Sequence, residues 1–110
     1  MRSLITAENA LEYLEIFRFL EPDICNAKQA QALNEHYEKI YNRNSIESQL
    51  LIIKEILLKE IEAKKNNRHL KQQDSEFLTL TDKPICEEFA FVLKKTPDEI
   101  KEQLRDIVTA

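Results

Sequence analysis

The sequence predicts an all-α protein, a compact bundle of about five helices. Three observations lead to this fold class. Apolar residues recur at intervals of three or four along most of the chain, which is the spacing of one face of an α-helix. Several of these runs begin at a residue that commonly caps a helix and stop at a proline or at a group of amides. The chain also contains no glycine, the residue on which the tight turns of β-hairpins usually depend.

The first predicted helix covers residues 7–20. Thr6 is suited to cap its start, and Pro22 prevents its continuation because proline has no backbone N–H and clashes with the preceding turn. The second helix is predicted to begin after Asn26, another common capping residue, and its apolar face continues as far as Tyr41. The polar residues that follow Tyr41 end the helical pattern.

The third predicted helix begins at Asn44 or Ser45 and is apolar on nearly every side. Its main stripe consists of Ile46, Leu50, Ile53, Leu57 and Ile61. A helix that is also apolar on both flanks of such a stripe normally lies at the centre of a bundle. If the bundle leaves flanking side chains exposed, they favour self-association or binding to a partner. The alternative is that the first or the last helix buries them. The candidate protein interface consists of Leu51, Leu58, Ile52 and Ile56.

The polar segment 64–75 is predicted to be the frayed end of the third helix followed by a linker. It would separate a three-helix N-terminal part from a two-helix C-terminal part within a single domain of residues 1–110. Residues 46–73 hold 6 basic and 4 acidic side chains, a local charge of +2 in a chain with a formal charge of −4. These basic side chains fit a site of contact with an anion, or alternatively an ordinary helix end that is exposed to solvent. The candidate anion-contact cluster consists of Lys64, Lys65, Arg68 and Lys71.

The C-terminal part is predicted to be a helical hairpin. Residues 76–81 alternate weakly between polar and apolar side chains and fit either a short strand or a loop. A helix is then predicted to begin at Thr81 or Asp82, with Pro84 in its first turn, where proline is well tolerated. The last helix is predicted to begin at Thr96, because the proline, aspartate and glutamate that follow make this the strongest capping signal in the chain.

Composition argues against several functional classes. Without glycine, the chain lacks the usual residue of phosphate-binding loops and dinucleotide-binding turns, so we expect no cofactor. Neither histidine has the spacing of a metal ligand and no serine lies in a glycine-flanked elbow, so we expect no metal and no enzymatic activity.

Cys25 and Cys86 lie far apart, and we expect buried, reduced thiols, with a single disulfide as the alternative. The N-terminal residues resemble neither a signal peptide nor a membrane span, which predicts a cytoplasmic protein.

One alternative function is DNA binding by the C-terminal hairpin. Four apolar residues lie at offsets that resemble the helix-turn-helix pattern: Ala90, Leu93, Ile100 and Leu104. That resemblance implies a DNA-binding regulator, with the basic cluster as an arm that contacts phosphates. However, Lys94 stands where the turn usually has glycine, and the last helix presents acidic side chains that would repel phosphates. These acidic side chains belong to Asp98, Glu99, Glu102 and Asp106.

A weaker alternative is an enzyme that depends on Mg²⁺. The pairs Glu12/Glu15 and Glu35/Glu38 resemble the ExxE-type motifs of all-helical nucleotide pyrophosphatases. The resemblance implies that four carboxylates converge between two helices, where they would hold Mg²⁺ and polarise a pyrophosphate. The second motif of that family ends in aspartate rather than glutamate, and the spacing recurs by chance in a chain this rich in glutamate.

The sequence therefore predicts a small, non-catalytic helical protein-interaction module, such as an adaptor, an inhibitor or a regulatory subunit. The expected partner is another protein or a second copy of the chain. We do not expect a nucleic acid or a membrane as a partner, because no basic stripe and no long apolar segment is present.

Overall fold

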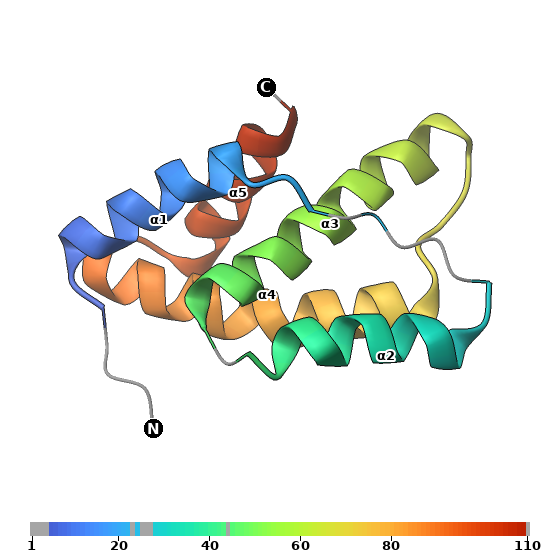
Figure 1. Ribbon diagram of the computed structural model, residues 1–110. Helices are drawn as coiled ribbons and strands as arrows, with labels where there is room; N and C mark the ends of the chain where they lie inside the picture. Colours follow the sequence, from blue (N-terminus) through green and yellow to red (C-terminus); the bar gives the residue numbers. More distant parts are fainter. Residues whose placement is uncertain (1–4, 23, 25–27, 44, 110) are drawn as a thin grey trace.

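Five α-helices account for most of the part of the chain that the structure describes (Figure 1). The structure is a computed structural model that describes residues 5–22, 24, 28–43 and 45–109. The described residues contain no β-strand, which confirms the all-α prediction. The helices are, in chain order, α1 (Ala7–Phe19), α2 (Ala30–Tyr41), α3 (Ile46–Lys65), α4 (Gln72–Leu93) and α5 (Pro97–Thr109).

The two longest helices, α3 and α4, form the centre of the bundle. They pack against each other, and each of them also contacts α1, α2 and α5. In Figure 1, α2 lies along the first half of α4, whereas α1 and α5 lie near its second half. The resulting body has a radius of gyration of 13.7 Å. The central position predicted for the third helix is therefore confirmed.

All five helices contribute to one hydrophobic core. α3 is buried around most of its circumference because it has neighbours on several sides, which explains why its apolar residues are not confined to one stripe. The fully buried large side chains include Phe17, Leu33, Tyr37, Leu50, Ile52, Ile56, Ile85, Phe89, Ile100 and Leu104. A single core shared by every helix means that the two predicted parts of the chain do not fold around separate centres.

Three of the predicted helix starts are confirmed by side-chain caps. The hydroxyl oxygen of Thr6 accepts a hydrogen bond from the backbone N–H of Asn9 at 3.1 Å. Ser45 and Ser48 form a reciprocal capping box at the start of α3. Thr96 accepts a hydrogen bond from a backbone N–H in the first turn of α5 at 3.2 Å. Each cap satisfies N–H groups that have no partner within the helix, so local sequence is sufficient to define these ends.

The start of α2 and the end of α1 depend on more than side-chain caps from neighbouring residues. α2 begins at Ala30 with Gln29 at its N-cap position and no side-chain cap, later than the predicted start after Asn26. Asn26 itself, like Asn44, lies outside the described residues. The C-terminus of α1 has a tertiary cap, because the ammonium of Lys54 donates hydrogen bonds to the carbonyl oxygens of its last turn at 2.8 and 2.9 Å.

The predicted linker 64–75 is too long, and the prediction of a strand or loop at 76–81 is wrong. α3 continues to Lys65 and α4 already begins at Gln72, so the connection comprises residues 66–71 only. Residues 76–81 lie entirely within α4. Packing against α3 decides this, because the helical spacing of α4 buries at least one side chain per turn. The buried positions from Asp74 onward are Asp74, Leu78, Thr81, Ile85, Cys86, Phe89 and Ala90.

The sequence predicted that Pro84 lies in the first turn of a separate helix. This prediction is wrong, because Pro84 is an interior residue of α4. Its ring is exposed to solvent. Proline removes one backbone hydrogen bond from the helix, and on an exposed face water can satisfy the carbonyl that is left over. The buried face of α4 is therefore uninterrupted at this position.

None of the helices in the described ranges combines the length and the apolar character needed to cross a membrane.

Charged side chains lie among the apolar residues in the middle of α3, at Lys54, Glu55 and Lys59. Glu55 is nevertheless fully buried, and such a charge requires partners inside the protein. Those partners lie below the pocket described next.

Candidate functional site

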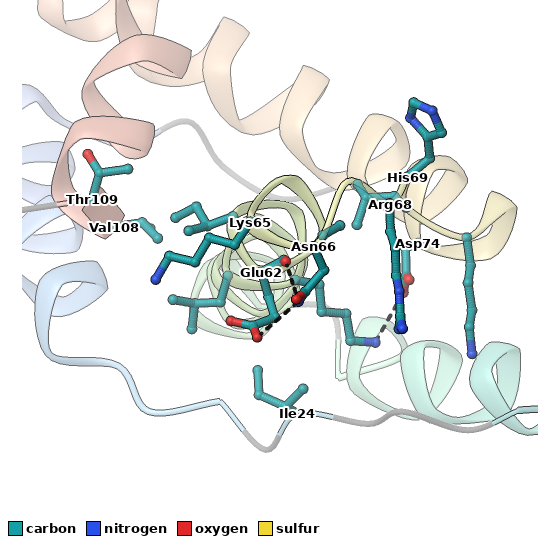
Figure 2. A pocket seen from close by; sticks show the side chains of 15 residues that line it. Ile24, Glu62, Lys65, Asn66, Arg68, His69, Asp74, Val108 and Thr109 are labelled. Carbon is teal, nitrogen blue, oxygen red and sulfur yellow. Dashed lines mark hydrogen bonds and ion pairs between the residues drawn. The ribbon is translucent and has the colours of Figure 1, made fainter.

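The candidate site is an open pocket at the C-terminal end of α3, which we call the α3-end pocket (Figure 2). It has a volume of about 720 Å³. Its walls come from the last turns of α3, the 66–71 connection, the first turn of α4 and the end of α5. Residues 58–74, which run continuously from α3 into α4, therefore meet Ile24 and the end of α5 around one opening.

Apolar side chains form a large part of the wall. They belong to Ile24, Leu58, Ile61, Leu70 and Val108. Leu58, Ile61, Leu70 and Val108 are only partly buried. An apolar surface that remains accessible in a concave pocket can bury the apolar side chain of a ligand. Leu58 is thus a residue of the predicted interface that lies in this pocket.

The predicted basic cluster lies mainly at the same pocket. Lys65, Arg68 and Lys71 contribute to its lining. Lys64 lies in an adjoining depression instead, where its ammonium is 3.3 Å from the carboxylate of Glu60. Three of the four predicted anion-contact residues are therefore brought together, and the fourth is paired elsewhere.

The pocket is locally positive in a chain that is negative as a whole. Four cationic side chains and two carboxylates line it, which gives a formal charge of +2 with His69 neutral, whereas the whole chain has −4. Lys65 and Arg68 form no ion pair with any described residue. The side-chain amide of Asn66 donates hydrogen bonds to the backbone carbonyl and the carboxylate of Glu62, at 3.0 and 3.3 Å. An anion that enters the pocket would meet cations without acidic partners.

Lys59 and Asp74 form the floor of the pocket and belong to a buried polar network. The ammonium of Lys59 lies 3.1 Å from the Asp74 carboxylate and 3.3 Å from the Glu55 carboxylate. It also donates a hydrogen bond of 2.9 Å to the hydroxyl oxygen of Tyr37. Tyr37 in turn donates its proton to Asp74. This network links α2, α3 and α4 directly below the pocket.

The protonation of Tyr37 follows from its surroundings. Burial raises its pKa above the ordinary value, and the hydrogen bond to Asp74 and the charges of Glu55 and Asp74 raise it further. Tyr37 therefore stays a neutral hydrogen-bond donor. Its ring also contacts the Lys59 ammonium, with 5.1 Å between the nitrogen and the ring centroid. The network is a structural support whose polar groups are already engaged with one another.

Sequence reasoning missed this network. His36 belongs to it as well, because its Nε2 lies 2.8 Å from a carboxylate oxygen of Glu55. A signal was present in the sequence, because Glu55 lies between two isoleucine-rich turns of a helix that is apolar on nearly every side. A charged residue in such a run must be buried and paired. Which residues would pair with it depends on the packing of α2 and α4 against α3.

The predicted interface is divided between the core and the surface. Ile52 and Ile56 are 0% exposed, so they belong to the core and cannot form an interface on the folded protein. This corrects the prediction, and the reason is that α3 has neighbours on more than one side. Leu51 is partly buried and packs against the core. Leu58 is also partly buried, and it lines the α3-end pocket, where an external ligand can reach it.

Cys86 is a free, buried thiol, as predicted. Burial and the neighbouring Asp82 carboxylate raise its pKa to about 12, so the thiolate that reacts in cysteine chemistry does not form at neutral pH. Cys25, the other predicted buried thiol, lies outside the described residues.

The α4–α5 hairpin does not have the charge distribution of a DNA reader. Lys94 takes the left-handed conformation, with φ of 57°, at the turn position where the helix-turn-helix pattern usually has glycine. Both basic residues of α5 are paired with acidic residues of other helices: Lys101 with Asp82 at 3.7 Å and Arg105 with Glu60 at 2.5 Å. The acidic side chains of α5 that the sequence predicted to be exposed all lie at the surface. DNA would therefore approach an acidic helix.

The carboxylates of the pyrophosphatase alternative do not converge. Glu12 and Glu15 lie on α1, Glu35 and Glu38 lie on α2, and all four are exposed. α1 and α2 do not contact each other. Within the described part of the chain, no three residues with metal-binding side chains gather at one point. The four-carboxylate arrangement that the ExxE resemblance implies is therefore not formed.

Comparisons with protein-family models, with curated proteins and with solved structures find no match to this chain. The chemistry of the α3-end pocket is thus the basis for a functional proposal.

Proposed function

We propose that this chain is a non-catalytic protein-interaction module, an adaptor, inhibitor or regulatory subunit, that holds a segment of a partner protein in the α3-end pocket. One observation carries the proposal. Leu58 of the predicted interface and Lys65, Arg68 and Lys71 of the predicted basic cluster line the same pocket. Apolar walls with a few polar groups at fixed positions are typical of a binding site.

The arrangement of the polar groups supports binding rather than catalysis. The two polar residues at the floor, Lys59 and Asp74, are bound to each other and to Tyr37. A general base or a nucleophile would need to present a reactive group to the ligand. The network instead gives the pocket a rigid base between three helices, which reduces the entropy lost when a partner binds.

The partner in this proposal is a different protein, and self-association is the alternative. The buried, free thiol of Cys86 is consistent with a cytoplasmic location, which remains part of the proposal. Sedimentation of the purified chain tests the alternative. A dimer that the substitution described below converts to a monomer would favour a second copy of the chain as the occupant.

Filling the pocket tests the proposal. Ala63 lies on its wall near the end of α3, and tryptophan at this position would occupy much of the space. Ala32→Trp is a matched control, because Ala32 is exposed on α2, which contributes no residue to the pocket. The wild type and both variants are used to capture proteins from lysate of the source organism, and the captured proteins are identified by mass spectrometry.

We expect a protein that the wild type and Ala32→Trp retain and that Ala63→Trp loses. Thermal melts that coincide for both variants would show that the loss is not caused by unfolding. If Ala63→Trp captures the same proteins in the same amounts as the wild type, the pocket is not the interaction site and the proposal is wrong.

A further inference from the structure

We infer that the segment bound by the α3-end pocket is acidic, a short stretch in which carboxylates flank an apolar side chain. The inference rests on the proposed function and adds the chemistry of the partner. It is carried by the contrast between a pocket with a formal charge of +2 and a chain with −4. Opposite charge between a site and its ligand favours association and excludes partners of the wrong sign.

Lys65 and Arg68 supply the anion-binding groups. Neither forms an ion pair with a described residue, so a carboxylate can bind to them without displacing an internal partner. Arginine binds a carboxylate through two parallel N–H groups, which fixes its orientation as well as its charge. In Figure 2, Lys65 extends toward Val108, whereas Arg68 lies on the other side of Asn66. Two separate cations suit a segment with more than one carboxylate.

The backbone holds Arg68 in place. Asn67 has a φ of 53°, and the N–H groups of Asn67 and Arg68 bond to the carbonyl oxygens of Lys64 and Ala63 at 3.3 and 2.7 Å. These bonds form a Schellman motif, which closes the C-terminus of a helix with a defined turn. The Arg68 backbone is therefore an extension of α3, and less freedom is lost when its side chain binds a ligand.

The apolar wall lies between and beside these cations. Leu58 and Leu70 are partly buried, and Val108 of α5 faces the same space. A ligand side chain such as leucine or phenylalanine would remove these surfaces from water. Free phosphate or a purely acidic polymer would leave them exposed, so the pocket favours an acidic segment that also has an apolar residue.

A nucleic acid fits the surroundings of the pocket poorly. DNA binding requires neutralisation of several phosphates, and Lys59, one of the four cations that line the pocket, is already paired with Glu55 and Asp74. Asp106 of α5 lines the depression next to the pocket. Lys65 and Val108 line both the depression and the pocket. A long polyanion would meet this carboxylate, whereas a short peptide can bind within the pocket.

A phage library of random 12-residue peptides, selected against the purified wild-type chain, tests the inference. Peptides that are selected are synthesised with an uncharged dye, and their binding is measured by fluorescence polarisation at low and high salt. The pocket variant is Lys65→Glu/Arg68→Glu. The control is Lys83→Glu/Lys95→Glu, which changes the net charge equally at two exposed lysines of another surface. A single-stranded DNA oligonucleotide serves as a competitor.

We expect the selected peptides to combine aspartate or glutamate with leucine, isoleucine or phenylalanine. Their affinity should fall about tenfold or more in the pocket variant, and in peptides with glutamine in place of glutamate, but change less than about twofold in the control variant. Higher salt should weaken the binding.

Other results would overturn the inference in distinguishable ways. Selected peptides that are neutral or basic, and that Ala63→Trp no longer binds, would leave the pocket as an interaction site but refute an acidic partner. Displacement of the peptides by the DNA oligonucleotide at lower concentration than by unlabelled peptide would assign the cations to nucleic acid. If no selected peptide is sensitive to Ala63→Trp, the proposed function fails together with the inference.

Discussion

The imidazole of His36, on α2, lies 2.8 Å from a carboxylate oxygen of Glu55, whose side chain on α3 is 0% exposed. The second carboxylate oxygen of Glu55 lies 3.3 Å from the ammonium of Lys59, and Lys59 in turn binds Asp74 of α4. A fully buried carboxylate is tolerated only because these partners replace the water that it has lost. The pair therefore joins two helices and stabilises the floor of the α3-end pocket.

Removal of the Glu55 carboxylate should be costly. We expect Glu55→Ala to lower the free energy of unfolding by about 3 kcal/mol, because it leaves a cavity and removes an acidic partner from a buried lysine. The exposed Glu38 on α2 is the control, and Glu38→Ala should change stability by less than about 0.5 kcal/mol. Urea denaturation measures both. Similar stabilities for the two variants would contradict the buried network.

The N-cap of α5 gives a smaller, local effect. Thr96→Ala should destabilise the protein by about 1 kcal/mol, because the backbone N–H of Glu99 would lose its hydrogen bond to the threonine hydroxyl. The same substitution at Thr79 should be neutral or slightly stabilising. Thr79 is an exposed interior residue of α4, where alanine has the higher helix propensity. Urea denaturation with equal effects at the two sites would show that α5 does not begin at Thr96.

Pro84 distinguishes a continuous α4 from two separate segments. In the middle of a helix, proline lowers the free energy of unfolding by about 3 kcal/mol. Proline also restricts the unfolded chain, and this effect offsets about 1 kcal/mol of the loss. Pro84→Ala should therefore stabilise the protein by about 2 kcal/mol. Pro97→Ala, at the first position of α5, should be neutral or destabilising, because proline is well placed there. A Pro84→Ala variant that melts at a lower temperature than the wild type would indicate that a helix begins near Pro84.

The turn between α4 and α5 contains a lysine in a conformation that favours glycine. Lys94 has φ of 57° and ψ of 46°, which crowds its Cβ atom. We expect Lys94→Gly to stabilise the protein by about 0.5–1 kcal/mol. Lys95 does not have a positive φ, so Lys95→Gly should be neutral or destabilising. Thermal unfolding of the two variants in parallel would check this difference, and a loss of stability in both would contradict the left-handed turn.

Glu60 gives the stability a pH dependence. Burial alone would raise its pKa, but the hydrogen bonds and charges of Arg105 and Lys64 outweigh burial and hold the pKa below its ordinary value of 4.5. The unfolded chain therefore takes up the proton at a higher pH than the folded protein does. The stability from this group is complete above the unfolded pKa and is lost as the pH falls through the folded pKa.

Arg105→Gln tests this dependence, because it removes the bidentate partner of Glu60. The difference in unfolding free energy between wild type and variant should be largest near pH 6–7. It should shrink as the pH falls below 4.5 and through the lowered folded pKa of Glu60, because Glu60 is then protonated in both states. Denaturant unfolding at several pH values measures it. A difference that is constant over this range would mean that the pair does not lower the pKa of Glu60.

The sequence by itself determined the features that depend on neighbouring residues. The caps at Thr6, Ser45 and Thr96 involve side chains within three residues of the N–H groups that they bind, so the starts of three helices were predicted correctly. The all-round apolar pattern of α3 identified it as the central helix for a similar reason, because the pattern is a property of one segment. The basic cluster, which includes Lys65 and Arg68, was also identified from the sequence, because its members lie within eight positions of one another.

Only the tertiary structure decided which of these residues meet. Residues 76–81 are helical because α3 provides a surface that buries one side chain on each turn of α4, and this contribution outweighs a weak local alternation. The same packing buries Ile52 and Ile56, leaves Leu58 accessible, and sets it beside Arg68 and Val108. Contacts between residues 10 to 50 positions apart depend on how whole helices pack. The pocket and the buried pairing of Glu55 therefore arise from tertiary contacts that no local pattern encodes.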